Sequence, residues 1–89
     1  MFYYVYCLES EGDKEHYFGY TNDLKRRIVE HNSKLNFSTK NKKWYIIYYE
    51  ACKDKDDAQR REKYLKTTQG RRMFKLRNKE YFYKQKNLT

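Results

Sequence analysis

The chain has 89 residues, of which 21 are basic and 12 are acidic, so its formal net charge is +9. A chain of this length forms one modest hydrophobic core, which excludes a second large domain. No apolar run approaches the roughly 20 residues that a membrane-spanning helix needs. The start, Met1 to Tyr4, also lacks the basic and apolar segments of a signal peptide. The positive charge indicates a polyanionic partner, either nucleic acid or an anionic membrane surface, unless it serves only solubility.

The core has to use aromatic rings, because 19% of the residues are aromatic and 11 are tyrosines. A tyrosine can bury its ring while its hydroxyl faces a site. The two cysteines, Cys7 and Cys52, are far apart and form no CxxC pair. We expect reduced, half-buried thiols in a cytoplasmic protein. With His16 and His31 they give four potential zinc ligands, but their spacing matches no zinc motif.

The first elements are predicted to be two antiparallel strands. Residues 2–9 have the aromatic and aliphatic pattern of a strand, residues 9–14 are polar and contain Gly12, and residues 15–20 read as a second strand. Gly19 near the end of this strand indicates a tight bend or the close approach of another group.

A helix is predicted to begin at residues 21–23, because Thr21 or Asn22 can accept backbone N–H bonds and Asp23 favours the positive end of the helix dipole. Leu24, Ile28 and His31 then recur at helical spacing, with Arg27 beside them. We expect a connecting loop over residues 32–43 and a strand at the centre of the sheet over residues 44–51.

The C-terminal half is predicted to be helical. Residues 54–66 have acids in the first turn and lysines in the last, as the helix dipole prefers. Gly70 is expected to interrupt the helical pattern. We expect a further helix over residues 71–83 and a frayed tail over residues 84–89. The order β-β-α-β-α-α predicts one α+β domain over residues 1–83, with helices flanking a three-stranded antiparallel sheet.

Two tyrosine motifs, Tyr4-Val5-Tyr6 and Tyr17-Phe18-Gly19, lie on the neighbouring predicted strands. Arg27 follows Asp23-Leu24 on the first helix, and His31-Asn32 comes one turn later. The second long helix has the pattern Ala-x-x-Arg-Glu-x-x-Leu-Lys, made by Ala58, Arg61, Glu62, Leu65 and Lys66. In this ordered combination the chain resembles the small bacterial members of the GIY-YIG nuclease family and the nuclease domain of the excision-repair nuclease subunit.

The chain departs from that family at a few positions. Tyr4 stands in place of the usual glycine of the first motif, and Phe18 in place of the isoleucine of the second. Tyr20 occupies the position where some repair enzymes carry a lysine, so one positive charge is missing from the expected site. The asparagine that assists the metal in some relatives has no obvious counterpart.

The resemblance implies a divalent-metal-dependent DNA endonuclease. It implies that Glu62 holds the metal, for which Mg²⁺ is suited and Mn²⁺ is an alternative. Arg27 would grip the scissile phosphate with its planar fork. Tyr17 would position or deprotonate the attacking water, with Tyr6 as its orienter. His31 is either a proton relay or a structural hydrogen-bond partner.

The remaining basic residues are predicted to contact the phosphate backbone, which provides affinity without base reading. Those that flank the proposed site are Lys25, Arg26, Lys40, Lys42, Lys43, Arg71 and Arg72. We expect structured or damaged DNA as the substrate, in repair or recombination, with RNA left open, and a monomer or weak homodimer with no membrane partner.

Other interpretations of the same residues stay open. Taken alone, Tyr6 and Tyr17 would be core rings, and Arg27 and Glu62 would be exposed helix residues. A catalytically inactive nucleic-acid-binding module with the same fold is the main alternative to a nuclease. A binder of anionic membranes is less consistent with the sequence, because no helix has a large apolar face opposite its charges.

Overall fold

The computed structural model of the chain describes residues 1–33 and 42–87. The three strands form one antiparallel sheet in the order β2-β1-β3. β1 (Tyr3–Ser10) is therefore central, with β2 (His16–Thr21) on one side and β3 (Trp44–Cys52) on the other. The predicted central position of the strand over residues 44–51 is wrong, because β1 pairs with both other strands and β3 lies at an edge. β2 is an edge strand, so one side of its backbone has no neighbouring strand in the described chain.

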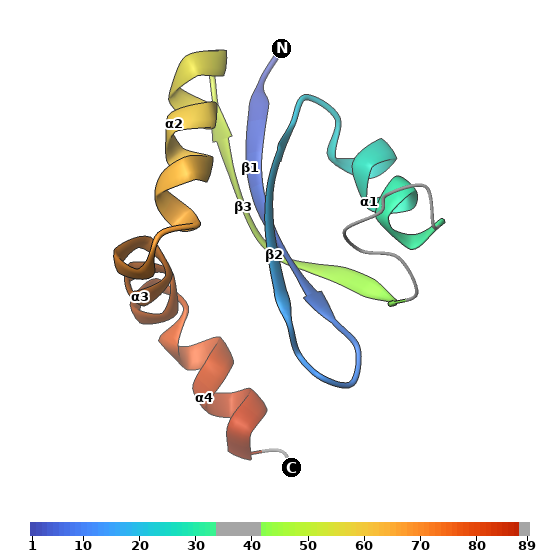
Figure 1. Cartoon of the computed structure of the whole chain (residues 1–89), viewed down its shortest axis with the longest axis vertical. Coiled ribbons are helices and arrows are strands. Elements are labelled where there is room, and N and C mark those ends of the chain that lie inside the picture. Colours follow the sequence, from blue (N-terminus) through green and yellow to red (C-terminus); the bar gives the residue numbers. More distant parts are fainter. Residues whose placement is uncertain (34–41, 88–89) are drawn as a thin grey trace.

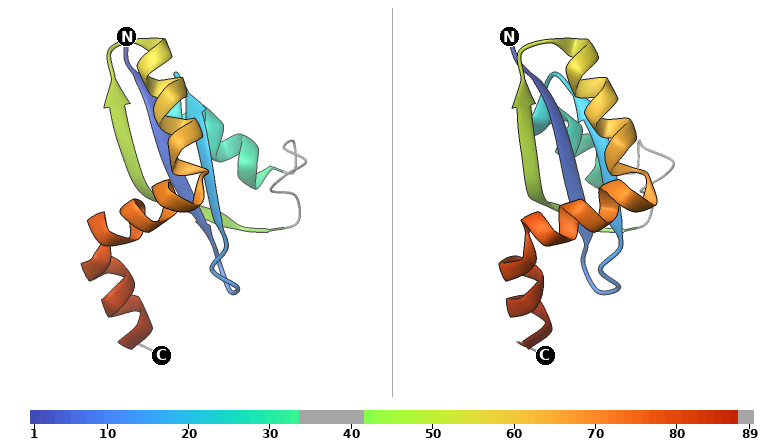
Figure 2. Two further views of the ribbon diagram at one scale, coloured as in Figure 1. Left: turned by 60° about the vertical axis from the view of Figure 1, so that its left-hand side comes forward. Right: turned by 90° about the vertical axis from the view of Figure 1, so that its left-hand side faces the viewer.

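The helices divide between the two faces of the sheet (Figure 1). α1 (Leu24–Asn32) lies on one face. α2 (Lys55–Leu65), α3 (Thr68–Arg77) and α4 (Lys79–Asn87) follow one another on the opposite side. α2 runs along the strands, whereas α3 lies across their direction (Figure 2). The α+β fold with a three-stranded antiparallel sheet is as predicted.

Alternation along β1 builds a separate core on each face, because successive side chains of a strand point to opposite sides. Val5 and Cys7 are buried toward α2 and α3, where they join Phe18, Ala58, Leu65 and Phe74. Tyr6 and Leu8 are buried toward α1, where they join Trp44, Tyr17, Leu24, Ile28 and Ile46. Each core is small, and both depend on aromatic rings, as the composition indicates.

The predicted break at Gly70 is wrong, because α3 begins two residues earlier and includes this glycine. The Thr67 side chain caps the helix by accepting a hydrogen bond from the Gly70 backbone N–H at 3.0 Å. Gly70 is buried, and a Cβ there would overlap the carbonyl oxygen of Tyr64 at the end of α2. The glycine thus permits close packing of two helices instead of ending one.

The predicted helix over residues 71–83 is in fact two helices. α3 ends at its C-cap Asn78, and α4 continues to Asn87, four residues past the predicted helix end. Residues 84–87 are therefore helical, which corrects the expected fraying there, and residues 88 and 89 lie outside the described chain. None of the helices in the described ranges is long and apolar enough to span a membrane.

Glu9 was expected at the start of a polar turn, but it is the penultimate residue of β1 and is fully buried. Its carboxylate accepts hydrogen bonds from side chains of β2, β3 and α4. These are His16 at 2.9 Å, Tyr45 at 2.5 Å, Tyr81 at 2.6 Å and Gln85 at 2.7 Å, and with Glu9 they form what we call the Glu9 cluster. The cluster ties α4 to the sheet. Cys7 and Cys52 form no disulfide, as predicted, but only Cys52 is half-buried, since Cys7 is fully buried in the core.

Candidate functional site

The site begins where the central strand meets the edge strand. Tyr6 of β1 pairs with Gly19 of β2, and a Cβ at Gly19 would overlap the Tyr6 hydroxyl and the adjoining ring carbons. The phenol end of Tyr6 therefore lies across Gly19 and reaches toward the open edge of the sheet. The predicted close approach at Gly19 is confirmed, and the group that approaches is Tyr6.

α1 brings two further side chains to the same hydroxyl. The Asp23 side chain caps this helix by accepting from the Arg26 backbone N–H at 3.2 Å. Arg27 and His31 are one turn apart on the face that packs on the sheet. Arg27 Nε lies 3.3 Å and His31 Nε2 lies 2.9 Å from the Tyr6 hydroxyl oxygen. We call Tyr6, Tyr17, Arg27 and His31 the Tyr6 cluster.

The chemistry of the donors fixes the direction of these hydrogen bonds. A guanidinium only donates, so the Tyr6 hydroxyl accepts from Arg27 and has its own proton left for His31 Nε2. Burial and the positive charge of Arg27 lower the pKa of His31 to about 4, so its imidazole is neutral at neutral pH and can accept. Burial also raises the pKa of Tyr6 to about 12, against the opposing effect of Arg27. Tyr6 thus stays protonated and oriented.

Tyr17 differs from Tyr6 in what its hydroxyl touches. Its ring lies edge-on to the His31 ring, with centroids 4.7 Å apart, and 6.4 Å from the Tyr6 ring. Within residues 1–33 and 42–87, the Tyr17 hydroxyl has no hydrogen-bond partner. Tyr17 therefore has the hydrogen-bonding capacity that a water or a substrate oxygen would use.

Arg27 is held from two sides while part of its guanidinium stays available. Its Nη1 donates to Glu30 at 3.0 Å, an i,i+3 pair that was not predicted although the helical spacing permits it. Burial acts against the charge, but the bonds to Glu30 and Tyr6 outweigh it and raise the pKa of Arg27. Nη2 makes no hydrogen bond in the described chain and is available for an anion.

Glu62 lies on α2, and within the described residues it forms no hydrogen bond or ion pair with the Tyr6 cluster. Its carboxylate is 2.9 Å from the ammonium of Lys66, one turn along the same helix, and its side chain is only 20% exposed. The Glu62 charge is nevertheless close enough to contribute, after burial, to the raised pKa of Tyr6. Lys66 is the partner of Glu62 in this structure.

The donor set can be tested for a metal. The described residues contain no group of three or more His, Cys, Asp or Glu side chains that could enclose an ion. Mg²⁺ needs few protein ligands, since it keeps several waters and is often held by one or two carboxylates together with substrate phosphate. Glu62 alone fits that mode of binding, whereas a tetrahedral zinc site would need more ligands.

The basic side chains that were predicted to bind phosphate differ in whether they form ion pairs with carboxylates. Lys42 is paired with Asp13 at 2.8 Å and Glu15 at 2.7 Å, and these bonds raise the pKa of Lys42. Two others have a carboxylate only at 3.9 Å, Arg26 near Glu30 and Lys43 near Glu11. Lys25, Arg71 and Arg72 have no acidic partner in the part of the chain that the structure describes, and Lys40 lies outside that part.

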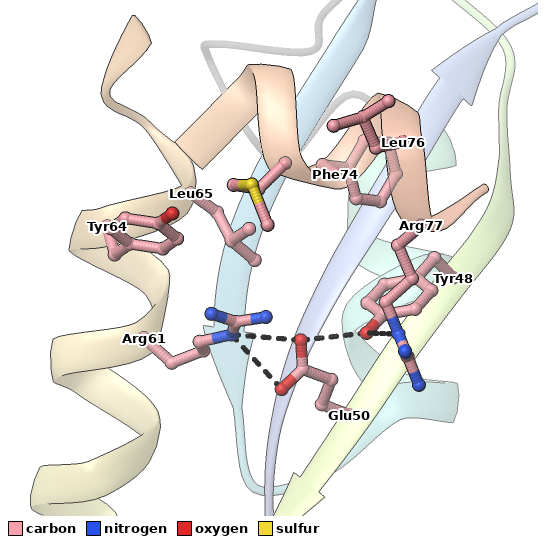
Figure 3. Close-up of a pocket in the computed structure, with 9 residues that line it drawn as sticks. Tyr48, Glu50, Arg61, Tyr64, Leu65, Phe74, Leu76 and Arg77 are labelled. Carbon is pink, nitrogen blue, oxygen red and sulfur yellow. Dashed lines mark hydrogen bonds and ion pairs between the residues drawn. The ribbon is translucent and has the colours of Figure 1, made fainter. Parts of the chain in front are cut away.

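A pocket of about 430 Å³ opens on the opposite face, between β3, α2 and α3 (Figure 3). Arg61 Nε donates to both carboxylate oxygens of Glu50, at 3.0 and 3.2 Å. Glu50 also accepts from the Tyr48 hydroxyl at 2.8 Å, and Arg77 donates to Tyr48 at 3.2 Å. Arg61, the motif residue beside Glu62, therefore joins α2 to β3 and lies away from the Tyr6 cluster.

Comparison with known proteins shows the family of the chain. Residues 2–78 match the model of the GIY-YIG catalytic domain. The chain belongs to the GIY-YIG family. It is 31% identical over 85 residues to a UPF0213 protein of Desulfotalea psychrophila, an alignment that covers 89% of this chain and 76% of that relative. No solved structure matches the chain significantly. The fold is therefore of the nuclease type, and α4 lies beyond the matched residues.

Proposed function

We propose that this protein is a divalent-metal-dependent DNA endonuclease that hydrolyses phosphodiester bonds. The observation that supports this most directly is that Arg27 and His31 both bond to the Tyr6 hydroxyl, while the Tyr17 ring packs edge-on against His31. A structural tyrosine needs one partner for its hydroxyl, whereas this cluster leaves Arg27 Nη2 and the Tyr17 hydroxyl unused. Unused donors beside a fixed hydrogen-bond network are what a phosphate and an attacking water require.

Arg27 would bind the scissile phosphate. Its Nε is engaged by Tyr6 and its Nη1 by Glu30, so the guanidinium plane is fixed before a substrate arrives. A donor held in place stabilises the charge that develops on the phosphate oxygens without reorganisation during the reaction. Lysine at this position would have a single charge and no plane to fix.

Tyr17 would position the attacking water, and the other residues would position Tyr17. His31 packs edge-on against the Tyr17 ring and at the same time accepts from Tyr6. In this arrangement a proton taken by His31 would come through Tyr6, and no hydrogen bond joins His31 directly to Tyr17. Tyr6 and His31 are therefore positioning residues in this proposal, and Tyr17 and Arg27 touch the reacting atoms.

Glu62 would hold the metal, Mg²⁺ or Mn²⁺, together with water and a phosphate oxygen. When bound, such an ion supplies charge neutralisation at phosphorus and stabilises the departing oxygen. Glu62 would have to release Lys66 from its present 2.9 Å ion pair, an i,i+4 pair of the kind that contributes about 0.3 to 0.5 kcal/mol on a helix. Lys66 would then be free to face the phosphate.

A binding module that cuts nothing is the alternative, and the intact set of Tyr6, Tyr17, Arg27 and Glu62 favours the nuclease. We further propose a cytoplasmic monomer or weak homodimer that acts on structured or damaged DNA in repair or recombination. The +9 charge supports a nucleic-acid partner without choosing between DNA and RNA.

The test is cleavage of end-labelled flap, junction, nicked and single-stranded DNA in Mg²⁺, Mn²⁺ or EDTA. We expect metal-dependent products from the wild type and none from Glu62→Gln, while Glu80→Gln, an exposed acid of α4, should cut normally. Calorimetry with Mn²⁺ should show weaker binding to Glu62→Gln. DNA binding without cleavage on every substrate would favour the binding module, and unchanged Mn²⁺ affinity would refute the ligand role of Glu62.

A further inference from the structure

A stripe of polar side chains follows one face of α3. Thr68, Arg71, Arg72 and Lys75 occupy positions i, i+3, i+4 and i+7, which share one side of a helix, and together they line a hollow of about 360 Å³. All four residues are exposed. We call them the α3 basic patch.

The patch carries three positive charges that nothing in the described structure neutralises. Residues 63–79 contain seven basic side chains and no acidic one. Arg71, Arg72 and Lys75 have no carboxylate within ion-pair distance in residues 1–33 and 42–87. Lys42 and Arg60, by contrast, are each paired at 2.8 Å or less. An exposed group of unneutralised cations on one helix face favours a polyanionic ligand.

The patch is also held rigidly. The Thr67 cap and the close packing of Gly70 against Tyr64 fix the start of α3, and Phe74 is buried beneath its middle. From Thr68 to Lys75 a helix rises about 10 Å, which corresponds to about three nucleotides of one strand at about 3.4 Å each. The geometry therefore suits several consecutive backbone phosphates.

One contact connects the patch with the Tyr6 cluster. The Arg71 guanidinium lies 5.3 Å from the centre of the Phe18 ring. Phe18 stands between Tyr17 and Gly19 on β2, and alternate side chains of a strand point to opposite faces. The patch and the Tyr6 cluster thus flank the same three residues from the two sides of an edge strand. A chain that crosses this open edge would meet both.

We propose that the α3 basic patch binds the phosphodiester backbone of the same nucleic acid that the Tyr6 cluster would cut, at phosphates other than the scissile one. The inference rests on the proposed function for its choice of nucleic acid. An anionic membrane would also present phosphates, but membrane-bound helices place apolar side chains beside their basic ones. The stripe itself contains no apolar residue, and the exposed Met73 and Leu76 of α3 line the other pocket.

The test is DNA binding in EDTA, so that cleavage is not required. Fluorescence anisotropy across a range of salt concentrations would compare the wild type with Arg71→Gln/Arg72→Gln/Lys75→Gln. The matched control is Lys53→Gln/Lys55→Gln/Lys84→Gln, which removes the same charge elsewhere. We expect the patch variant to lose at least about tenfold in affinity and its salt slope to fall by about 2 to 3, since each phosphate contact contributes about 0.7 to 0.9. The control should keep the wild-type slope.

Further outcomes separate the possible failures. Arg71→Lys/Arg72→Lys should bind almost as the wild type does, since backbone phosphates need charge more than a planar fork. Three results would each overturn the proposal. Both triple variants could lose the same DNA affinity, the wild type could fail to bind DNA, or the patch could bind phosphatidylserine vesicles in place of DNA. Patch-dependent binding by a wild type that never cuts DNA would uphold the patch and refute the nuclease. Circular dichroism would check that every variant folds.

Discussion

β1 carries two buried polar clusters only three residues apart, and they are built from similar parts. The Tyr6 cluster combines a tyrosine hydroxyl with a histidine and an arginine. The Glu9 cluster combines a carboxylate with a histidine, two tyrosines and a glutamine. Composition alone would make both of them candidates for a functional site.

The two clusters differ in how many of their hydrogen-bonding groups are left without a partner. Glu9 is fully buried and accepts four hydrogen bonds, and these outweigh burial to lower the pKa of Glu9. The Tyr6 cluster leaves the Tyr17 hydroxyl and one Arg27 nitrogen without a partner in the described chain. A saturated polar cluster stabilises a fold, whereas an unsaturated one at an open strand edge can bind a ligand. We therefore infer that the Glu9 cluster stabilises the fold and that the Tyr6 cluster binds a ligand.

The largest expected effect concerns activity and falls on the Tyr6 cluster. Arg27→Lys should reduce cleavage by at least about 100-fold, because lysine loses the planar bidentate contact with phosphate. DNA affinity should stay within about threefold of the wild type. Single-turnover kinetics and anisotropy would measure the two quantities, with Arg26→Lys on the same helix as the control. Wild-type cleavage by Arg27→Lys would contradict the phosphate role.

The largest expected effect on stability falls on the Glu9 cluster. Glu9→Gln should lower the free energy of unfolding by about 2 to 4 kcal/mol, because an amide donor replaces an oxygen that accepts from several groups. Urea denaturation would measure it, with the exposed Glu11→Gln as the control. Cleavage at a temperature where the variant is folded should be unchanged. A Glu9→Gln variant that folds but does not cut DNA would show that the Glu9 cluster is also needed for activity.

Acid should destabilise the Tyr6 cluster through His31. The folded protein holds the pKa of His31 near 4, while an unfolded histidine titrates near 6.5, so the unfolded state binds more protons between these values. Stability should therefore fall by up to about 3 kcal/mol as the pH drops from about 6.5 to about 4. Denaturation of the wild type and His31→Gln across this range would isolate the effect. Parallel pH profiles would show that His31 does not contribute.

The smallest expected effect is that of Tyr6→Phe, which removes one hydroxyl and leaves the ring across Gly19. The free energy of unfolding should fall by about 1 to 2 kcal/mol, since the His31 and Arg27 bonds lose a common partner. The cleavage rate should fall by about tenfold if Tyr6 only orients other groups. Tyr17→Phe should lose more activity and less stability. The reverse order would exchange the roles of the two tyrosines.

Much of the fold and of the candidate site could be predicted from local sequence. Some patterns depend on only a few neighbouring residues, and the structure contains the elements that they predict. They are the alternation of residues 2–9, the capped start before Leu24 and the helical spacing of Arg27 and His31. The two tyrosine motifs and the α2 pattern also predicted the family. The predicted break at Gly70 was wrong because a glycine in a helical pattern resembles an interruption. The residue is glycine because a side chain there would overlap the adjacent backbone of α2.

The sequence by itself determined the three strands, α1, α2 and the family, but not the bounds of α3 and α4. Only the tertiary structure decided that His31 bonds to Tyr6 and not to Tyr17, that Glu9 is buried, and that α4 docks on it through Tyr81 and Gln85. The physical reason is distance along the chain, since these partners come from different elements. Strand register, helix packing and burial select such pairs together, and no local pattern encodes them.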